Sequence, residues 1–95
     1  MMITLARSPE AQAAAAAEWM AFNDDYLIER IASTGRLEVI FACVDDAVTR
    51  LQSLVSGERS PDSRVLWTTE VQGHHLTVVI TGDADAVVEA GRLLR

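Results

Sequence analysis

The residues of this chain that could carry chemistry are one cysteine, two adjacent histidines and several carboxylates. Cys43 ends the apolar run LEVIFAC, a position where cysteine is usually a small buried hydrophobic residue. A nucleophilic cysteine needs a neighbouring base, and the only imidazoles in the chain are His74 and His75. No serine carries the G-x-S-x-G signature either. The sequence therefore predicts no catalytic constellation, and we expect a protein that is not an enzyme.

The histidine pair raises the question of a metal site. Neighbouring side chains in a strand point to opposite faces, so His74 and His75 cannot easily bind one ion, and a site would need further ligands. The pair follows Gly73 in the stretch EVQGHH, which is typical of a polar, exposed turn. We expect neither a metal nor another cofactor.

The stretch VVITGDADAVVEAG has the strand, glycine and helix order of a phosphate-binding loop. It has one glycine in the turn and no lysine, and Asp83 and Asp85 stand where the phosphate would lie. Those carboxylates suit a helix N-terminus but repel an anion. We therefore predict that Gly82 only turns the chain and that Asp83 caps the last helix.

Composition restricts the class of partner and the compartment. The 95 residues carry a net charge of −6, with eight basic residues scattered among fourteen acidic ones. Binding to nucleic acid or to an anionic membrane requires clustered basic residues, so we expect neither partner. A single cysteine excludes an intramolecular disulfide, and the first ten residues lack the pattern of a signal peptide. These features favour a cytoplasmic protein.

The elements expected in the first half are strand, helix, strand and helix. Residues 1–7 form a short apolar strand, and Ser8-Pro9 begins an alanine-rich helix that ends at Gly35, unless Asn23 and the two aspartates after it start a new helix. The Trp19, Phe22 and Tyr26 stripe on that helix indicates a core or a subunit interface. A covered strand follows over residues 37–43, and Asp45 caps a second helix that ends before the loop 56–64.

The second half adds a hairpin and a helix. In RVLWTTEVQ, alternate residues share one face, and HLTVVIT returns as the partner strand. The last helix buries a stripe of Val87, Val88, Gly91 and Leu94. The order is β-α-β-α-β-β-α, an α+β fold with an antiparallel or mixed sheet and helices on one face. We expect one domain over residues 1–95, in which residues 1–35 precede a β-α-β-β-α core at 37–95.

The C-terminal two-thirds resembles the bacterial microcompartment shell domain. The likeness rests on a strand that ends in a Gly-Asp turn and continues as a small-residue helix, and LEVIFACVDDAVTRLQSLV is similar to the family's first strand and helix. The matching residues are Val78, Val79, Ile80, Thr81, Gly82, Asp83, Ala86, Val87, Ala90 and Gly91.

The resemblance implies a structural protein that forms cyclic homo-oligomers, usually hexamers, which tile into a shell with other shell proteins. It implies that Gly73, His74 and His75 form a pore loop, and that Ala86, Ala90 and Gly91 allow close contact between subunits. The chain departs from the family in its loop SGERSPDSR, which has no lysine, and in having no strand after the last helix. An N-terminal strand moved from the C-terminus by circular permutation fits that second departure.

The β-α-β-β-α order is also typical of a small ferredoxin-like domain. Such a domain would dimerise through its sheet and act in regulation or in binding a small ligand. The sequence leaves both alternatives open.

Overall fold

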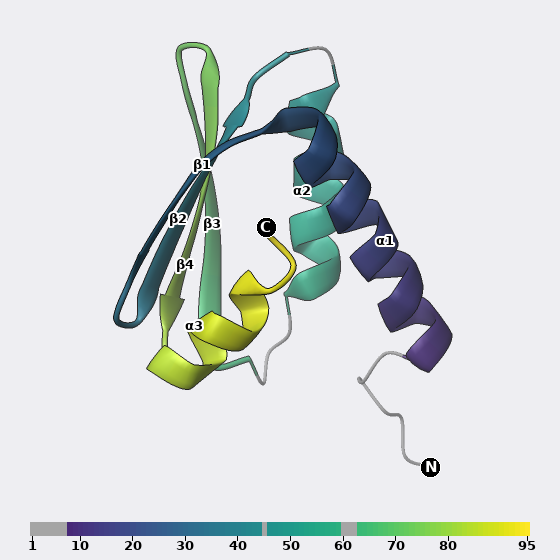
Figure 1. Ribbon diagram of the computed structural model, residues 1–95, viewed down its shortest axis with the longest axis vertical. Helices are drawn as coiled ribbons and strands as arrows, with labels where there is room; N and C mark the ends of the chain where they lie inside the picture. Colours follow the sequence, from purple (N-terminus) through teal and green to yellow (C-terminus); the bar gives the residue numbers. More distant parts are fainter. Residues whose placement is uncertain (1–7, 45, 60–62) are drawn as a thin grey trace.

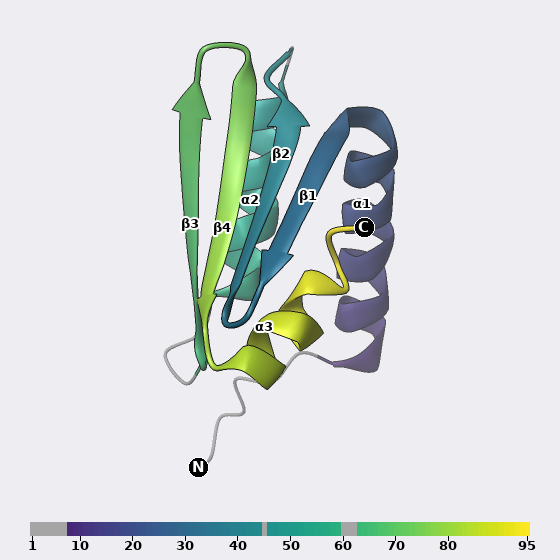
Figure 2. The same ribbon diagram turned by 60° about the vertical axis from the view of Figure 1, so that its left-hand side comes forward.

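The computed structural model describes residues 8–44, 46–59 and 63–95. Four strands form one antiparallel sheet in the order β1-β2-β4-β3, and three helices cover one face of it (Figure 1). Figure 2 shows the strands side by side, with the helices behind and beside them. The elements in chain order are α1 (Pro9–Tyr26), β1 (Leu27–Ser33), β2 (Arg36–Ala42), α2 (Ala47–Glu58), β3 (Val65–Gln72), β4 (His75–Gly82) and α3 (Ala84–Gly91).

The α+β class is confirmed, but the predicted element order is wrong. The helix that was expected to reach Gly35 ends at Tyr26, and Leu27 takes extended angles, φ −64° and ψ 127°. Strand β1 then turns at Thr34-Gly35 and pairs with β2. Asn23 does not interrupt α1, because it lies inside the helix. The strand predicted at residues 1–7 lies outside the described residues.

The second helix begins and ends later than predicted. Asp46 occupies its N-cap position, whereas the predicted cap, Asp45, lies outside the described residues. The helix continues through Gly57 to Glu58, so the predicted loop 56–64 is shorter than expected. Strands β2 and β3 are parallel and flank β4, to which both pair antiparallel. The β2-α2-β3 segment is therefore a split β-α-β unit, the arrangement found in ferredoxin-like folds.

The core lies between the sheet and the helices and draws on every helix and on three of the strands. Trp19 stacks on Trp67, with ring centroids 5.7 Å apart, and Phe22 packs against Phe41 at 4.9 Å. The aromatic stripe of α1 therefore packs in the core, which is one of the two roles predicted for it, the other being a subunit interface. On α3 the prediction was wrong for Val88, which is 63% exposed, and correct for Val87, Gly91 and Leu94, which are buried.

The C-terminal segment is held by side chains from elements far away in the sequence. The last carbonyls of a helix have no partner inside it. Here Asn23 of α1 donates a 2.7 Å hydrogen bond to the carbonyl of Leu93. Arg30 of β1 donates to the carbonyls of Leu94 and Gly91, at 2.8 and 3.1 Å. These bonds fix the end of α3 against α1 and β1.

Candidate functional site

The β3–β4 hairpin places the predicted pore-loop residues Gly73, His74 and His75 at one exposed tip of the molecule. The N–H of Cys43 donates to the carbonyl of His74 at 2.9 Å, so the cysteine and the tip are neighbours. The Cys43 side chain, however, packs against the core on the helix side. His75 pairs with Ala42 in the ladder, which puts its side chain on the opposite face. The thiol and the His75 imidazole therefore do not form a nucleophile–base pair.

Histidine is also a metal ligand, and a metal site at this tip would need further ligands beside the two histidines. Among residues 8–44, 46–59 and 63–95, no three His, Cys, Asp or Glu side chains lie close enough together to hold an ion.

The Gly82-Asp83 turn uses its backbone donors within the chain. The N–H of Gly82 donates to the carbonyl of Gly35 at 3.1 Å, and that of Asp83 donates to Arg64 at 3.3 Å. A phosphate loop needs such groups free to bind the anion. Asp83 occupies the N-cap position of α3, but its carboxylate caps no backbone N–H and lies 3.9 Å from Arg64. The N–H groups of Gly82 and Asp83, in the turn that connects β4 to α3, are therefore not free to bind a phosphate.

The small residues of α3 lie in two different surroundings. Ala86 and Ala90 line an open groove of about 700 Å³ between α1, α3 and the start of β3. Gly91 is buried inside the chain, where an added Cβ would lie 2.7 Å from Leu37 Cδ2. The close packing at Gly91 is therefore a contact within one subunit, and only the two alanines face a space that a neighbour could enter.

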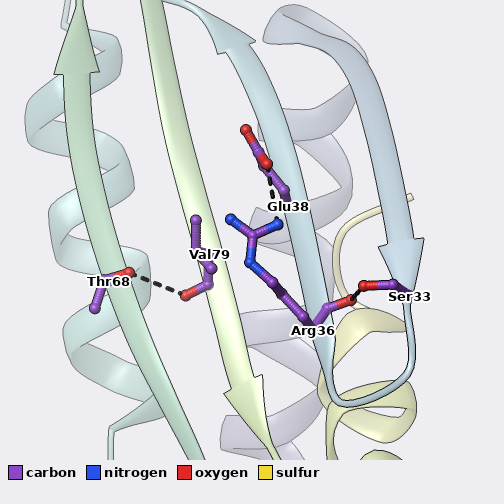
Figure 3. A network of polar contacts seen from close by, with 5 residues as sticks. All are labelled: Ser33, Arg36, Glu38, Thr68 and Val79. Carbon is purple, nitrogen blue, oxygen red and sulfur yellow. Dashed lines mark hydrogen bonds and ion pairs between the residues drawn. The ribbon is translucent and has the colours of Figure 1, made fainter.

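The face of the sheet opposite the helices is uncovered by any described residue, and sequence reasoning did not single it out. Figure 3 shows this face, with the helices behind the strands. Four of its aliphatic residues, one from each strand in the order β1, β2, β4 and β3, are Ile31, Ile40, Val79 and Leu66. In the ladder, each is the diagonal neighbour of the next. Diagonal neighbours lie roughly 7–8 Å apart, within reach of large side chains. We call these four residues the apolar stripe.

The stripe is accessible at both ends. Leu66 is 62% exposed and Ile31 is 44% exposed, while Ile40 and Val79 are half-buried between them. The alternation of apolar and polar residues in β3 indicates that one face of the sheet is open to solvent. Only the register of the strand pairs shows that four aliphatic residues, one from each strand, are neighbours on that face.

Polar contacts beside the stripe are satisfied within the face (Figure 3). Arg36 and Glu38 form an ion pair at 3.1 Å. The hydroxyl of Thr68 donates to the carbonyl of Val79 at 3.3 Å, and that of Ser33 donates to Arg36 at 3.4 Å. The open face therefore carries one balanced ion pair and two further carboxylates, Glu29 and Glu70, which lie on β1 and β3 in the same ladder row as Ile40.

The two edges of the sheet are less suited to pairing with another strand. Strand β1 has an irregularity between Leu27 and Glu29, and bulges and charged residues discourage edge pairing. On β3, Arg59 donates a 3.0 Å hydrogen bond to the carbonyl of Trp67 and so occupies an acceptor that a partner strand would need. The open face is the more available surface.

A cation joins α1 and α2 at the end of the molecule where α2 begins. Arg50 donates to the Tyr26 hydroxyl at 3.3 Å and lies 3.7 Å from Asp25. Its guanidinium also stands 5.5 Å from the Phe22 ring centroid. The hydrogen bond with Tyr26 is the main cause that raises the pKa of Arg50 above its ordinary value. These contacts connect two helices and leave Arg50 a structural role.

No protein-family model matches this chain, and comparisons with curated proteins and with solved structures found no match either. None of the helices in the described part of the chain is both long and apolar enough to cross a membrane.

Proposed function

We propose that this chain is a non-catalytic structural protein that assembles with further copies of itself, and that the open sheet face is the contact surface. The apolar stripe is the observation that carries the proposal. Single exposed aliphatic residues are normal on a protein surface, whereas aliphatic residues that are neighbours across several strands favour an interaction site. The stripe crosses all four strands on a face that no described residue covers.

The chemistry of the face supports a second copy as the partner. A two-fold axis would place stripe against stripe, because such a contact uses the same patch on both subunits. The charged pair Arg36 and Glu38 contains both signs, while the carboxylates of Glu29 and Glu70 lie on the two edge strands, where they can stay in water. Each residue of the pair can therefore meet its opposite charge in the other copy, and neither is buried alone.

A contact of this kind closes as a dimer, and a shell-type ring requires a second contact. The exposed tip Gly73, His74 and His75 supports a ring axis, and the groove beside Ala86 and Ala90 offers room for a neighbour. In that arrangement the protein is a shell component that works with other shell proteins. The lone thiol of Cys43 fits a cytoplasmic location.

The test is native mass by light scattering on a sizing column, over a range of protein concentration. We expect the unaltered chain to form a discrete oligomer and Leu66→Glu to be monomeric, because the new carboxylate would be buried without a partner in the contact. Met20→Glu is the matched control, since Met20 is 64% exposed on α1, away from the sheet face. Circular dichroism establishes that both variants are folded.

The measured mass distinguishes a sheet-to-sheet dimer from a ring and from a chain that does not self-assemble. A dimer supports the sheet-to-sheet contact, and a hexamer supports the ring as well. A chain that is monomeric at every concentration contradicts self-assembly. An oligomer that Leu66→Glu and Met20→Glu weaken equally, or not at all, contradicts the sheet face as its contact surface.

A further inference from the structure

A second feature lies on the helix side of the sheet, between β1 and α3. It is a cavity of about 260 Å³, smaller than the roughly 300–1,000 Å³ typical of drug-sized sites. Its lining residues are Arg30, Ala32, Ser33, Arg36, Leu37, Val87, Val88 and Arg95.

The charge of this cavity is unusual for so acidic a chain. Three arginines and no acidic side chain line it, although the chain has fourteen acidic residues and only eight basic ones. The other cavities described each include a carboxylate: Glu58 and Glu89 in the groove beside α1, Glu18 in a second and Asp85 in a third. The β1–α3 cavity therefore favours an anion.

Arg30 is the fixed part of this cavity. Its Nε and Nη2 atoms donate to the carbonyls of Leu94 and Gly91, at 2.8 and 3.1 Å. These bonds occupy one edge of the planar guanidinium and hold it in place, while the edge formed by Nη1 and Nη2 retains free donors. Within the described part of the chain, no carboxylate lies in ion-pair range of Arg30. Its charge is thus held in position but not neutralised.

The other two arginines differ in what they can contribute. Arg36 is already paired with Glu38 on the open sheet face, so its charge is largely compensated. Arg95 is exposed and, among the described residues, has no acidic partner. An anion in the cavity would therefore interact mainly with Arg30 and Arg95.

The remaining lining residues select the body of the ligand. Leu37 and Val87 are buried, while Val88 is 63% exposed at the rim. These aliphatic side chains stabilise an apolar group of the ligand. They cannot form the hydrogen bonds that a phosphate or a sugar would need, so they disfavour nucleotide-like ligands. Guanidinium groups bind planar carboxylates with two parallel hydrogen bonds. We propose that the cavity binds a small organic carboxylate with a short aliphatic body. This proposal does not depend on self-assembly, because none of the four residues of the apolar stripe lines the cavity.

The experiment is a titration followed by amide NMR, with hexanoate as the probe. Hexanol tests whether the charge is needed, and inorganic phosphate tests whether the aliphatic body is needed. We expect hexanoate to shift saturably the signals of residues 30–37 and 87–95, and hexanol and phosphate to bind at least about tenfold more weakly.

Variants locate the site without disturbing the fold. Arg30 is left intact because it holds the end of α3. Arg95→Gln should weaken hexanoate binding about tenfold, the scale of a charge-assisted hydrogen bond. Arg92→Gln is the matched control, since Arg92 pairs with Glu89 and does not line this cavity. Absence of saturable shifts overturns the proposal. Equal binding of hexanol or phosphate, or equal effects of the two arginine variants, also overturns it.

Discussion

Two glycine turns at the ends of β4 provide the sharpest test of the fold. Gly73 begins the turn before β4 and Gly82 ends the strand, with φ values of 60° and 145°. An added Cβ at Gly73 would meet no atom within 4 Å, whereas at Gly82 it would overlap the backbone carbonyl oxygen of Arg64. Gly73→Ala and Gly82→Ala are therefore the same chemical change at a positive φ. Only at Gly82 does the added Cβ meet a backbone atom.

The expected losses in the free energy of unfolding differ several-fold between the two variants. An L-residue at the left-handed angles of Gly73 costs about 1–2 kcal/mol. Replacing glycine also restricts the unfolded chain, which returns about 0.4–1 kcal/mol in both variants. Gly73→Ala should therefore lose about 1 kcal/mol. At Gly82 the angle lies in a nearly glycine-only region, at about 1–3 kcal/mol, and the overlap adds about 1–3 kcal/mol more. After the same return of about 0.4–1 kcal/mol, Gly82→Ala should lose about 1–6 kcal/mol, centred on about 3 kcal/mol, a large part of the about 5–15 kcal/mol typical of a whole domain.

Urea unfolding followed by tryptophan fluorescence measures both values. Trp19 and Trp67 are 0% and 3% exposed and stack on each other, so their emission reports the loss of the core directly. Equal losses for the two alanine variants would refute the argument, because they would show that Arg64 moves away without cost. A Gly82→Ala protein too unstable to purify, beside a folded Gly73→Ala protein, agrees with the prediction.

Two further predictions concern the polar contacts of α1. Asn23→Ala removes the donor to the carbonyl of Leu93 and should cost about 1–3 kcal/mol in urea unfolding, whereas exposed Asp24→Ala should change stability by less than about 0.5 kcal/mol. The raised pKa of Arg50 means that its contribution is fully present below the unfolded-state pKa and is lost only as the pH rises through the higher folded-state value. The stability difference between the unaltered chain and Arg50→Gln should therefore stay constant from about pH 6 to about pH 9, and a difference that falls across this range would contradict the assignment.

Local patterns predicted the elements whose partners lie nearby in the chain. The two faces of β3 and its return as β4 follow from alternation around a short turn, and the structure confirms both. The position of Gly82 at a turn follows from the end of the β-branched run. The segment 27–33 was assigned to a helix because Leu27 and Ile31 have helical spacing and no glycine or proline comes before Gly35. Pairing with β2 outweighs that local preference, since strand propensity depends strongly on tertiary context.

The candidate surfaces were less predictable than the elements. The apolar stripe depends on the register of three strand pairs, and its two outer members, Ile31 and Leu66, are far apart in the sequence. The β1–α3 cavity depends on Arg30, which falls inside the segment assigned to a helix. Neither surface contains a local motif, so the strand order had to be known first.

The bonds that hold the end of α3 have a consequence for how the chain folds during synthesis. Asn23 and Leu93 are 70 residues apart, and Arg30 and Leu94 are 64 apart. While the ribosome is still making the second hairpin, α1 lacks both the Trp67 ring and the carbonyls that it later binds. Trp19 therefore lacks its stacking partner until Trp67 has emerged from the exit tunnel, and the bonds of Asn23 and Arg30 form only after residues 91–94 have emerged. We expect this protein to acquire its core late, and a nascent chain arrested before residue 91 to be a good substrate for chaperones.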